Sequence, residues 1–316
     1  RTLFVSTSRT THFLYTVCMS FSIQTFTQAQ YKDHPLLARL LELHDIPEHM
    51  HIAGTLPDIH IDTYGRATPR ILTVVGSRHY TTYGKLAIEK LIGTLAGTDV
   101  IILSGLALGI DGISHECALK HNITTIGIPG SGIDLRVIHP RTNVHVATKI
   151  VESGGALMSE YDPLSRPAQW TFVARNRIMA ALADAVLIVE AHEKSGTLVT
   201  ARLALELGKD IGAIPGDIFS AASQGTNMLI KEGAYMIRNA DDLYDLLHLT
   251  REEQTITSKI YSSDEQLLLS ILSEPMEKDT LLIRSELPLN LFLTAFSSLE
   301  MKGSIQETFG EVRRLV

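Results

Sequence analysis

Cysteine is scarce in this sequence, and its two copies do not form a recognisable site. Cys18 and Cys117 lie far apart, in neither a metal-binding nor a redox spacing. This excludes a disulfide framework and is typical of a protein from a reducing compartment, so we expect a cytoplasmic location.

Metal-binding and catalytic patterns are lacking as well. The segment 30–60 contains histidines whose spacing matches no common ligand set, namely His44, His49, His51 and His60. We interpret them as solvated loop histidines. No nucleophile elbow, zinc-protease motif or carboxylate pair is visible. We therefore expect no bound metal, no cofactor and no enzymatic activity.

Long apolar runs and an excess of positive charge are also missing. No apolar run approaches the ~18 residues of a membrane span, so we expect no membrane segment. The 28 Lys and Arg residues are outnumbered by 35 Asp and Glu residues, which gives a formal charge of −7. A protein coated in basic surface is thereby excluded, and a site for a polyanion must be a local cluster of Arg and Lys.

The first residues show no clear pattern. Residues 1–27 mix Thr, Ser and Phe without periodicity, and no small-residue cleavage site follows them. We expect a disordered or over-extended N-terminus, with Met19 as the true start. Residues 28–69 are expected to form a short helical segment, with one amphipathic helix at 35–44.

From residue 71 onward, apolar runs of strand length alternate with segments of helical period. Strands are predicted at 71–75, 100–103, 124–128, 156–158, 185–189 and 211–214. Continuously apolar strands that alternate with helices predict a mainly parallel sheet covered on both faces. The predicted fold class is therefore α/β, with this doubly wound domain at residues 70–248.

The C-terminal part differs in pattern and charge. Residues 249–262 are polar and predict a linker, and residues 263–316 predict three short helices and a small ribbon, the order of a winged-helix-like domain. A helix that reads a DNA groove needs Arg, Lys, Asn or Gln. The third predicted helix, 289–302, offers mainly Leu, Phe, Ala, Ser and Thr. We expect it to pack or contact protein rather than read DNA.

Glycines and polar residues follow nearly every predicted strand. Since the carboxyl ends of parallel strands share one edge of a sheet, these clusters predict a ligand-binding edge. Gly76-Ser77-Arg78 is neither a phosphate loop of the Walker type nor a GxGxxG turn, but it places a guanidinium at this edge. The 194–197 turn, Lys-Ser-Gly-Thr, precedes a helix and predicts a second anion-binding turn.

The segment 170–180 combines two aromatic and two basic side chains. Trp170, Phe172, Arg175 and Arg177 stand at the beginning of an apolar helix. Guanidinium groups beside rings suit a ligand with phosphates and stackable bases, which means a nucleotide or a nucleic-acid strand. A core Trp/Phe pair followed by a salt-bridged helix is the structural alternative.

These motifs, in this order, resemble the DNA-processing protein A (DprA/Smf) family over residues 30–248. The resemblance is carried by Gly76-Ser-Arg78, Ser104-Gly-Leu-Ala-Leu-Gly-Ile-Asp111 with His115, Gly130-Ser-Gly-Ile-Asp134 with Pro140 and Asn143, Phe172 with Arg175-Asn-Arg177, Ser195-Gly-Thr-Leu-Val-Thr-Ala201 and Gly225-Thr-Asn227. It implies an extended Rossmann domain that binds single-stranded DNA, forms a homodimer and helps load the RecA recombinase during natural transformation.

The strand ends and the resemblance together predict a nucleic-acid-binding site. Its residues are Gly76, Ser77, Arg78, Ser104, Gly105, Gly109, Gly130, Gly132, Phe172, Arg175, Asn176, Arg177, Lys194, Ser195, Gly196 and Thr197. Arg78, Arg175 and Arg177 are expected to hold phosphates. The family's usual Phe-Pro is Phe172-Val173 here, and its usual Tyr-Pro is His139-Pro140. Neither departure removes a charge from the predicted pocket.

An enzyme on the same fold is the alternative function. A phosphoribohydrolase of nucleoside monophosphates needs a Pro-Gly-Gly-x-Gly-Thr-x-x-Glu loop, whose carboxylate assists glycosidic cleavage. The equivalent turn here is Glu193-Lys194-Ser195-Gly196-Thr197, and Thr200 stands in place of the Glu. The sequence therefore favours a binding protein over this enzyme.

Overall fold

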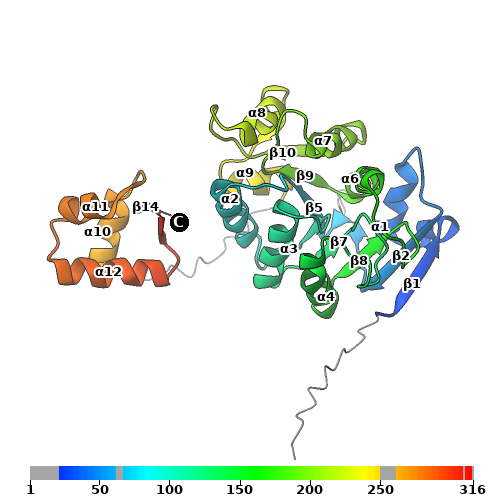
Figure 1. Ribbon diagram of the computed structural model, residues 1–316, viewed down its shortest axis with the longest axis horizontal. Helices are drawn as coiled ribbons and strands as arrows, with labels where there is room; N and C mark the ends of the chain where they lie inside the picture. The colour runs from blue at the N-terminus through cyan, green and yellow to red at the C-terminus, as the bar shows by residue number, and fades with distance from the viewer. Residues whose placement is uncertain (1–20, 62–66, 250–260, 309, 315–316) are drawn as a thin grey trace, which may run out of the picture. The chain divides into compact units, whose positions relative to one another are not determined.

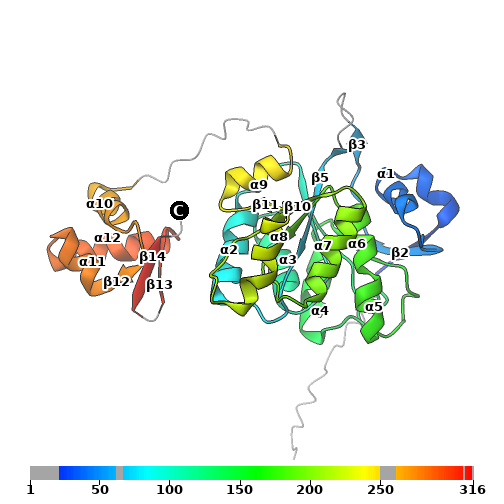
Figure 2. The same cartoon turned by 90° about the horizontal axis from the view of Figure 1, so that it is seen from above.

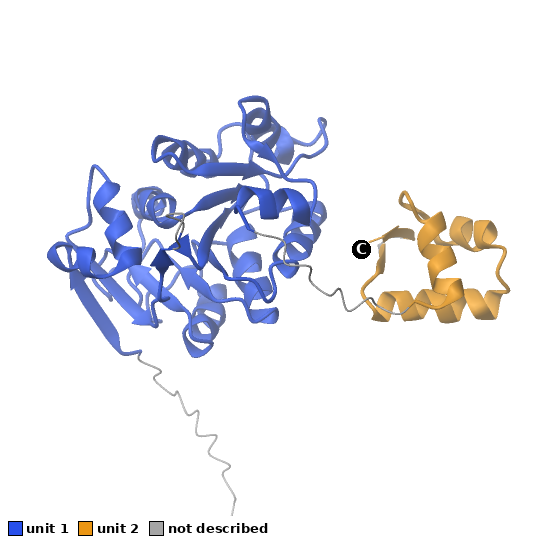
Figure 3. Cartoon of the chain, turned by 180° about the vertical axis from the view of Figure 1, so that it is seen from behind, with its two compact units in different colours: residues 1–249 blue, residues 250–316 orange. Residues whose placement is uncertain are grey.

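The computed structural model describes residues 21–61, 67–249, 261–308 and 310–314. They belong to two compact units, residues 1–249 and residues 250–316 (Figure 3). The expected start at Met19 and most of the expected linker, 250–260, lie outside the described residues. No helix in the described ranges has the length and apolar character that a membrane crossing requires.

A nine-stranded sheet organises the larger unit (Figure 1). Its strands, in spatial order, are β1 (Ile23–Thr27), β2 (His49–Gly54), β8 (Ala156–Ser159), β7 (Thr125–Gly127), β6 (Val100–Ser104), β5 (Arg70–Val75), β9 (Ala185–Ile188), β10 (Asp210–Ala213) and β11 (Tyr235–Met236). All neighbours from β8 to β11 pair in parallel, whereas β1 and β2 are antiparallel additions. The predicted mainly parallel α/β sheet is confirmed.

Helices cover both faces of this sheet because its central strands are apolar on both sides. In β5, Ile71 and Val75 pack into one core cluster, while Leu72 and Val74 pack into another on the opposite face. Figure 1 shows α2 and α3 on one side of the sheet and α6 and α7 on the other. The helices are α2 (Thr82–Gly93), α3 (Ile110–Lys120), α4 (Val144–Glu152), α5 (Gln169–Ala174), α6 (Asn176–Leu182), α7 (Gly196–Glu206), α8 (Gln224–Lys231) and α9 (Ala240–Leu246).

The segment 28–69 differs from the expected short helical segment. It contains α1 (Pro35–Ala38) and two 3-10 helices in place of one continuous helix, and β2 joins the main sheet beside β8. The expectation of solvated loop histidines is wrong for His51, which is buried in β2. Its ring nitrogen Nδ1 lies 2.8 Å from Thr25 Oγ1 on β1. A two-residue ribbon, β3 (His60–Ile61) with β4 (Ala67–Thr68), precedes β5.

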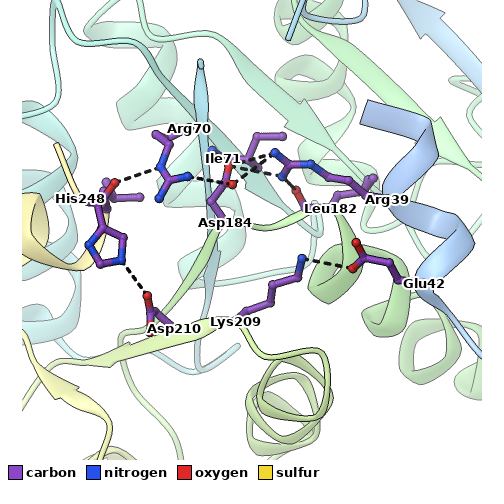
Figure 4. A network of polar contacts seen from close by, with 10 residues as sticks. Arg39, Glu42, Arg70, Ile71, Leu182, Asp184, Lys209, Asp210 and His248 are labelled. Atoms are coloured by element: carbon purple, nitrogen blue, oxygen red, sulfur yellow. Dashed lines mark hydrogen bonds and ion pairs between the residues drawn. The ribbon is translucent and has the colours of Figure 1, made fainter. Parts of the chain in front are cut away.

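A polar network at the amino end of β5 and β9 ties this segment to the sheet (Figure 4). Asp184, just before β9, accepts a 2.7 Å hydrogen bond from the Ile71 backbone amide. The same carboxylate pairs with Arg39 at 3.2 Å and Arg70 at 3.3 Å. Arg39 also donates to the Leu182 carbonyl. Since all three charged side chains are largely buried, the network is structural and lies away from the predicted ligand edge.

The smaller unit is a set of three helices with a three-stranded sheet. The elements run α10 (Ser263–Ile271), β12 (Met276–Glu277), α11 (Lys278–Ser285), α12 (Leu289–Met301), β13 (Ile305–Thr308) and β14 (Glu311–Arg314). Phe292, Phe296 and Leu299 of α12 face inward and are buried. The expected small C-terminal domain with helices and a ribbon is therefore confirmed. The additional strand β12 has two residues, too few for an alternating pattern of apolar and polar residues to reveal it in the sequence.

Candidate nucleic-acid interface

The order of the strands reverses between β5 and β9. From β5 the chain proceeds through β6 and β7 to β8 in one direction, and it then returns to β9 on the other side of β5. Loops that leave the carboxyl ends of β5 and β9 therefore diverge to opposite faces and leave a crevice between them. The predicted ligand edge has its natural opening at this point.

A cleft of about 330 Å³ occupies this crevice. It is lined by Val75, Gly76, Ser77, Arg78, His79, Ala107, Asp111, Phe172, Val173, Arg175, Asn176, His192, Lys194, Ser195, Gly196, Thr197 and Thr200. The lining comes from loops that follow β5, β6 and β9 and from the α5–α6 junction. The structure thus brings ten of the predicted site residues together, from three separate parts of the sequence.

The loop after β5 presents Arg78 to the cleft. Ser77 is buried, and its Oγ accepts a 3.1 Å hydrogen bond from the His79 amide, which closes a tight turn. The exposed Arg78 guanidinium lies 5.2 Å from the centre of the Phe172 ring. The buried Glu190 holds the far end of this loop, because its carboxylate accepts hydrogen bonds from the amide and hydroxyl of Thr81 at 2.9 and 2.5 Å. Arg78 is therefore an exposed cation on a loop that is fixed at both ends.

The opposite wall is the beginning of α7. Ser195 caps this helix and accepts a 3.1 Å hydrogen bond from the Thr197 amide. Thr197 Oγ1 donates to the Gly76 carbonyl at 3.2 Å, which joins the two anion-binding turns predicted from the sequence. Lys194, one residue before the cap, is exposed and has no acidic partner within 4.0 Å in the described part of the chain. Its charge adds to the positive end of the α7 dipole.

Phe172 forms the aromatic wall of the cleft and is half-buried. Its ring lies so close to Gly130 that a Cβ at that position would overlap the ring, which explains a glycine there. The His139 ring packs against the edge of Phe172 with ring centres 6.1 Å apart. One face of the Phe172 ring carries the Arg78 guanidinium, so an aromatic surface and a cation stand together at the mouth of the cleft.

Arg175 is placed differently from the expectation that it grips phosphate. Only 4% of the residue is exposed, and its guanidinium donates to the Gly105 carbonyl at 2.6 Å and to the Ile128 carbonyl. A side chain on Gly105 would overlap this guanidinium. Asp111 lies 3.9 Å away. Burial lowers the pKa of Arg175 to about 10 and raises the pKa of Asp111. Arg175 therefore ties the ends of β6 and β7 together beneath the cleft floor.

Arg177 does not line the cleft. Its guanidinium bonds the Glu160 carboxylate at 2.6 and 3.1 Å and lies 3.4 Å from Asp45. Side chains two residues apart on a helix point about 200° away from each other around its axis. Arg175 and Arg177 therefore cannot face the same way. The expectation that both arginines complete one basic pocket is wrong for Arg177, whose charge is already neutralised.

The remaining predicted residues support the cleft from behind it. Ser104 is fully buried and donates to the Val74 carbonyl at 2.7 Å. Gly109 begins α3, where the Ile110 amide donates to the Ser77 carbonyl at 3.2 Å. Gly132 donates its amide to the Ser165 carbonyl at 2.9 Å. Ser104, Gly105, Gly109, Gly130 and Gly132 are absent from the cleft lining.

The sequence-based prediction missed several lining residues. His79 and His192 are exposed cleft residues that follow β5 and β9, and their positions directly after strands could have identified them. Val173 reaches the cleft although it is neither polar nor aromatic. His115, by contrast, is fully buried, with Nδ1 2.7 Å from Thr125 Oγ1, and burial lowers its pKa to about 3. It is a neutral core histidine.

The fold defines an α/β protein of the extended Rossmann class, with a cleft at the strand crossover. The family model described as DNA recombination-mediator protein A matches residues 23–248. Protein Smf of Escherichia coli is 35% identical over 287 residues, which cover 88% of this chain and 74% of that protein. DNA processing protein DprA of Bacillus subtilis is 38% identical over 178 residues, 56% of this chain and 59% of that protein.

Solved structures agree with this match. DNA processing protein A of Streptococcus pneumoniae superposes with a TM-score of 0.61 at 33% identity, covering 72% of this chain and 75% of that chain. DNA processing protein A of Helicobacter pylori, described for its single-stranded DNA binding mode, superposes with a TM-score of 0.59 at 31% identity over 72% of this chain and 96% of that chain. The chain belongs to the DNA recombination-mediator protein A family.

Proposed function

We propose that this chain is a single-stranded DNA-binding recombination mediator. The observation that carries the proposal is the cleft at the β5–β9 crossover, which is lined by the exposed cations Arg78 and Lys194 and by the Phe172 ring beneath Arg78. Phosphates meet the two cations and the first amides of α7, and a base packs on the ring. Such contacts are independent of sequence and sensitive to salt.

The kind of nucleic acid follows from the charge distribution. A formal charge of −7 leaves the chain without the broad basic surface that binds duplex DNA. A local cluster of cations in a cleft is better suited to a single strand. The third helix of the smaller unit, α12, exposes Leu289, Leu291 and Leu293, and Lys302, which follows it, pairs with Glu265 at 2.6 Å. These side chains do not provide the donors that groove reading needs. Binding of the strand is therefore assigned to the larger unit.

A binding role agrees with the contents of the cleft better than the enzymatic alternative. Among the described lining residues the one carboxylate is Asp111, which is buried beside Arg175. Thr200, at the position of the glutamate that a phosphoribohydrolase would need, is buried as well. We propose that the protein acts without catalysis, in the cytoplasm, by protecting incoming single strands and helping RecA to assemble on them during natural transformation.

We expect a fluorescent single-stranded oligonucleotide to be displaced by unlabelled single strand and not by an equal concentration of duplex. Fluorescence anisotropy measures the displacement, and a linear fall of log affinity with log salt reports the phosphate contacts. In the same mixtures the protein should shorten the lag of RecA filament formation on strands covered by a single-strand-binding protein. Equal displacement by duplex would contradict the assigned strand preference, and an unchanged lag would contradict the mediator role.

A homodimer is the second part of the proposal. The strand β11 is the last of the nine-stranded sheet, and its two residues, Tyr235 and Met236, are 47% and 44% exposed. In the turn after β10, Ile218 and Phe219 are 79% and 91% exposed. An apolar sheet edge of this kind favours pairing with another copy, because a two-fold axis brings the same surface of both chains together.

We expect the double substitution Phe219→Glu and Met236→Lys to halve the mass measured by light scattering. Each change places a charge at a surface that a dimer would have to desolvate. The control is Leu205→Glu, which charges a side chain of α7 that is 68% exposed. A mass that stays at two copies in the double variant would rule out this sheet edge as the interface.

A further inference from the structure

Trp170 is an exposed indole with little of the protein around it. It is the one tryptophan of the chain, and 64% of the residue is open to solvent. The Tyr161 ring stands perpendicular to it, with ring centres 5.8 Å apart and an angle of 88° between the planes. Large aromatic side chains usually bury most of their surface. An indole left this open is therefore a candidate for contact with a ligand.

The surface that carries Trp170 continues the rim of the cleft. Trp170 and Val173 are three residues apart on α5, so they share one face of this helix. Val173 is 51% exposed and also lines the cleft. α5 lies at the opposite end of the sheet from the β3–β4 ribbon (Figure 2). Because this ribbon precedes β5, α5 lies toward the carboxyl ends of the strands, where the residues that line the cleft follow β5 and β9. A strand that leaves the cleft over Val173 therefore meets Trp170 next.

A cation lies four residues before this ring in the sequence. Arg166 precedes α5 by three residues, is exposed, and has no acidic group within 4.0 Å in the part of the chain that the structure describes. Its segment is held against the 130–134 loop by the bond from the Gly132 amide to the Ser165 carbonyl. The segment 166–170 thus has the same kinds of side chain as the cleft, an exposed aromatic ring and an exposed guanidinium.

We propose that Trp170 is a second stacking platform, which holds a base of the single strand outside the cleft while Arg78 and Lys194 hold its phosphates. The inference rests on the proposed function and extends its site. Phe172 is partly covered by Arg78 and His139, so it can take few bases. Trp170 adds a larger open plane, and stacking on a plane tolerates every base. The platform lengthens the binding site without adding sequence preference.

Contact with a protein partner is the competing use of an exposed ring. Leu164, 55% exposed, and Val173 would then form one apolar patch with Trp170. Val173 favours the nucleic acid, because it shares a helix face with the indole and also lines the cleft. A protein contact depends on apolar area alone and does not distinguish strands with bases from strands without them.

The test uses the full-length protein and three variants, Trp170→Ala, Trp170→Phe and, as a control, Leu205→Ala. The probes are a single-stranded thymidine oligonucleotide and a sugar-phosphate strand of equal length without bases. We expect Trp170→Ala to weaken binding of the thymidine strand roughly tenfold with an unchanged salt slope, since stacking involves no phosphate. Trp170→Phe should recover most of the affinity, and Leu205→Ala should bind as the parent does.

The indole itself gives an independent readout. Because the chain has one tryptophan, its emission reports on this position alone. The thymidine strand should quench the emission, and the strand without bases should leave it unchanged. Equal affinity of Trp170→Ala and the parent, together with unquenched emission, would overturn the platform even if Arg78→Ala abolishes binding. If Arg78→Ala binds normally, the assigned cleft fails instead, and quenching still decides the role of Trp170.

Discussion

Replacing Arg78 by alanine should weaken binding of single-stranded DNA by roughly tenfold or more at about 0.1 M salt and lower the salt slope by about 0.7. The change removes an exposed guanidinium that has no acidic partner within 4.0 Å among the described residues. It also removes the cation that lies 5.2 Å from the Phe172 ring. Fluorescence anisotropy at several salt concentrations measures both effects.

The matched substitutions separate charge from geometry. Arg78→Lys keeps the charge but loses the planar fork, so we expect the salt slope of the parent with a lower affinity. Lys194→Ala should flatten the slope by a similar amount, because its charge is equally exposed. Lys90→Ala removes an exposed charge of α2 that does not line the cleft. An affinity and slope of Arg78→Ala that match those of Lys90→Ala would refute the cleft as the binding site.

The fold could largely be predicted from the sequence because each parallel strand is a short, continuously apolar run that can be recognised from its own residues. Runs such as that of β5 are apolar on both faces, which is the pattern of a strand covered on both sides. The strands β1 and β2 could not be found in this way. His51 interrupts the apolar pattern of β2 and is accommodated only because Thr25 of β1 lies opposite it. This pairing depends on contacts between strands rather than on local sequence.

The position of the site was predictable, but the roles of its arginines were not. Strand ends with Gly, Ser and Arg locate the edge, and the cleft lies there. The burial of Arg175 depends on the Gly105 and Ile128 carbonyls, which follow β6 and β7 and meet only in the folded sheet. The helical period shows that the side chains of Arg175 and Arg177 point in different directions. It does not show which of the two points into the protein.

Replacing Arg175 by methionine should destabilise the larger unit by about 3–5 kcal/mol and leave the salt slope of the remaining folded protein unchanged. The substitution keeps much of the side-chain volume but removes every donor. Two strand-end carbonyls then lose their partner, and the buried Asp111 loses the charge 3.9 Å away. Urea unfolding followed by Trp170 emission reports on this unit by itself, since the smaller unit has no tryptophan.

Two further variants test whether the loss of stability depends on how deeply the arginine is buried. Arg166→Met removes an exposed guanidinium, so its unfolding midpoint should stay within experimental error of the parent. Arg177→Met breaks a largely buried pair with Glu160 and should cost about 1–2 kcal/mol, less than at Arg175 because this pair still reaches solvent. A stable Arg175→Met protein with a flattened salt slope would show that Arg175 reaches phosphate after all. In that case the floor of the cleft would have to open when the strand binds.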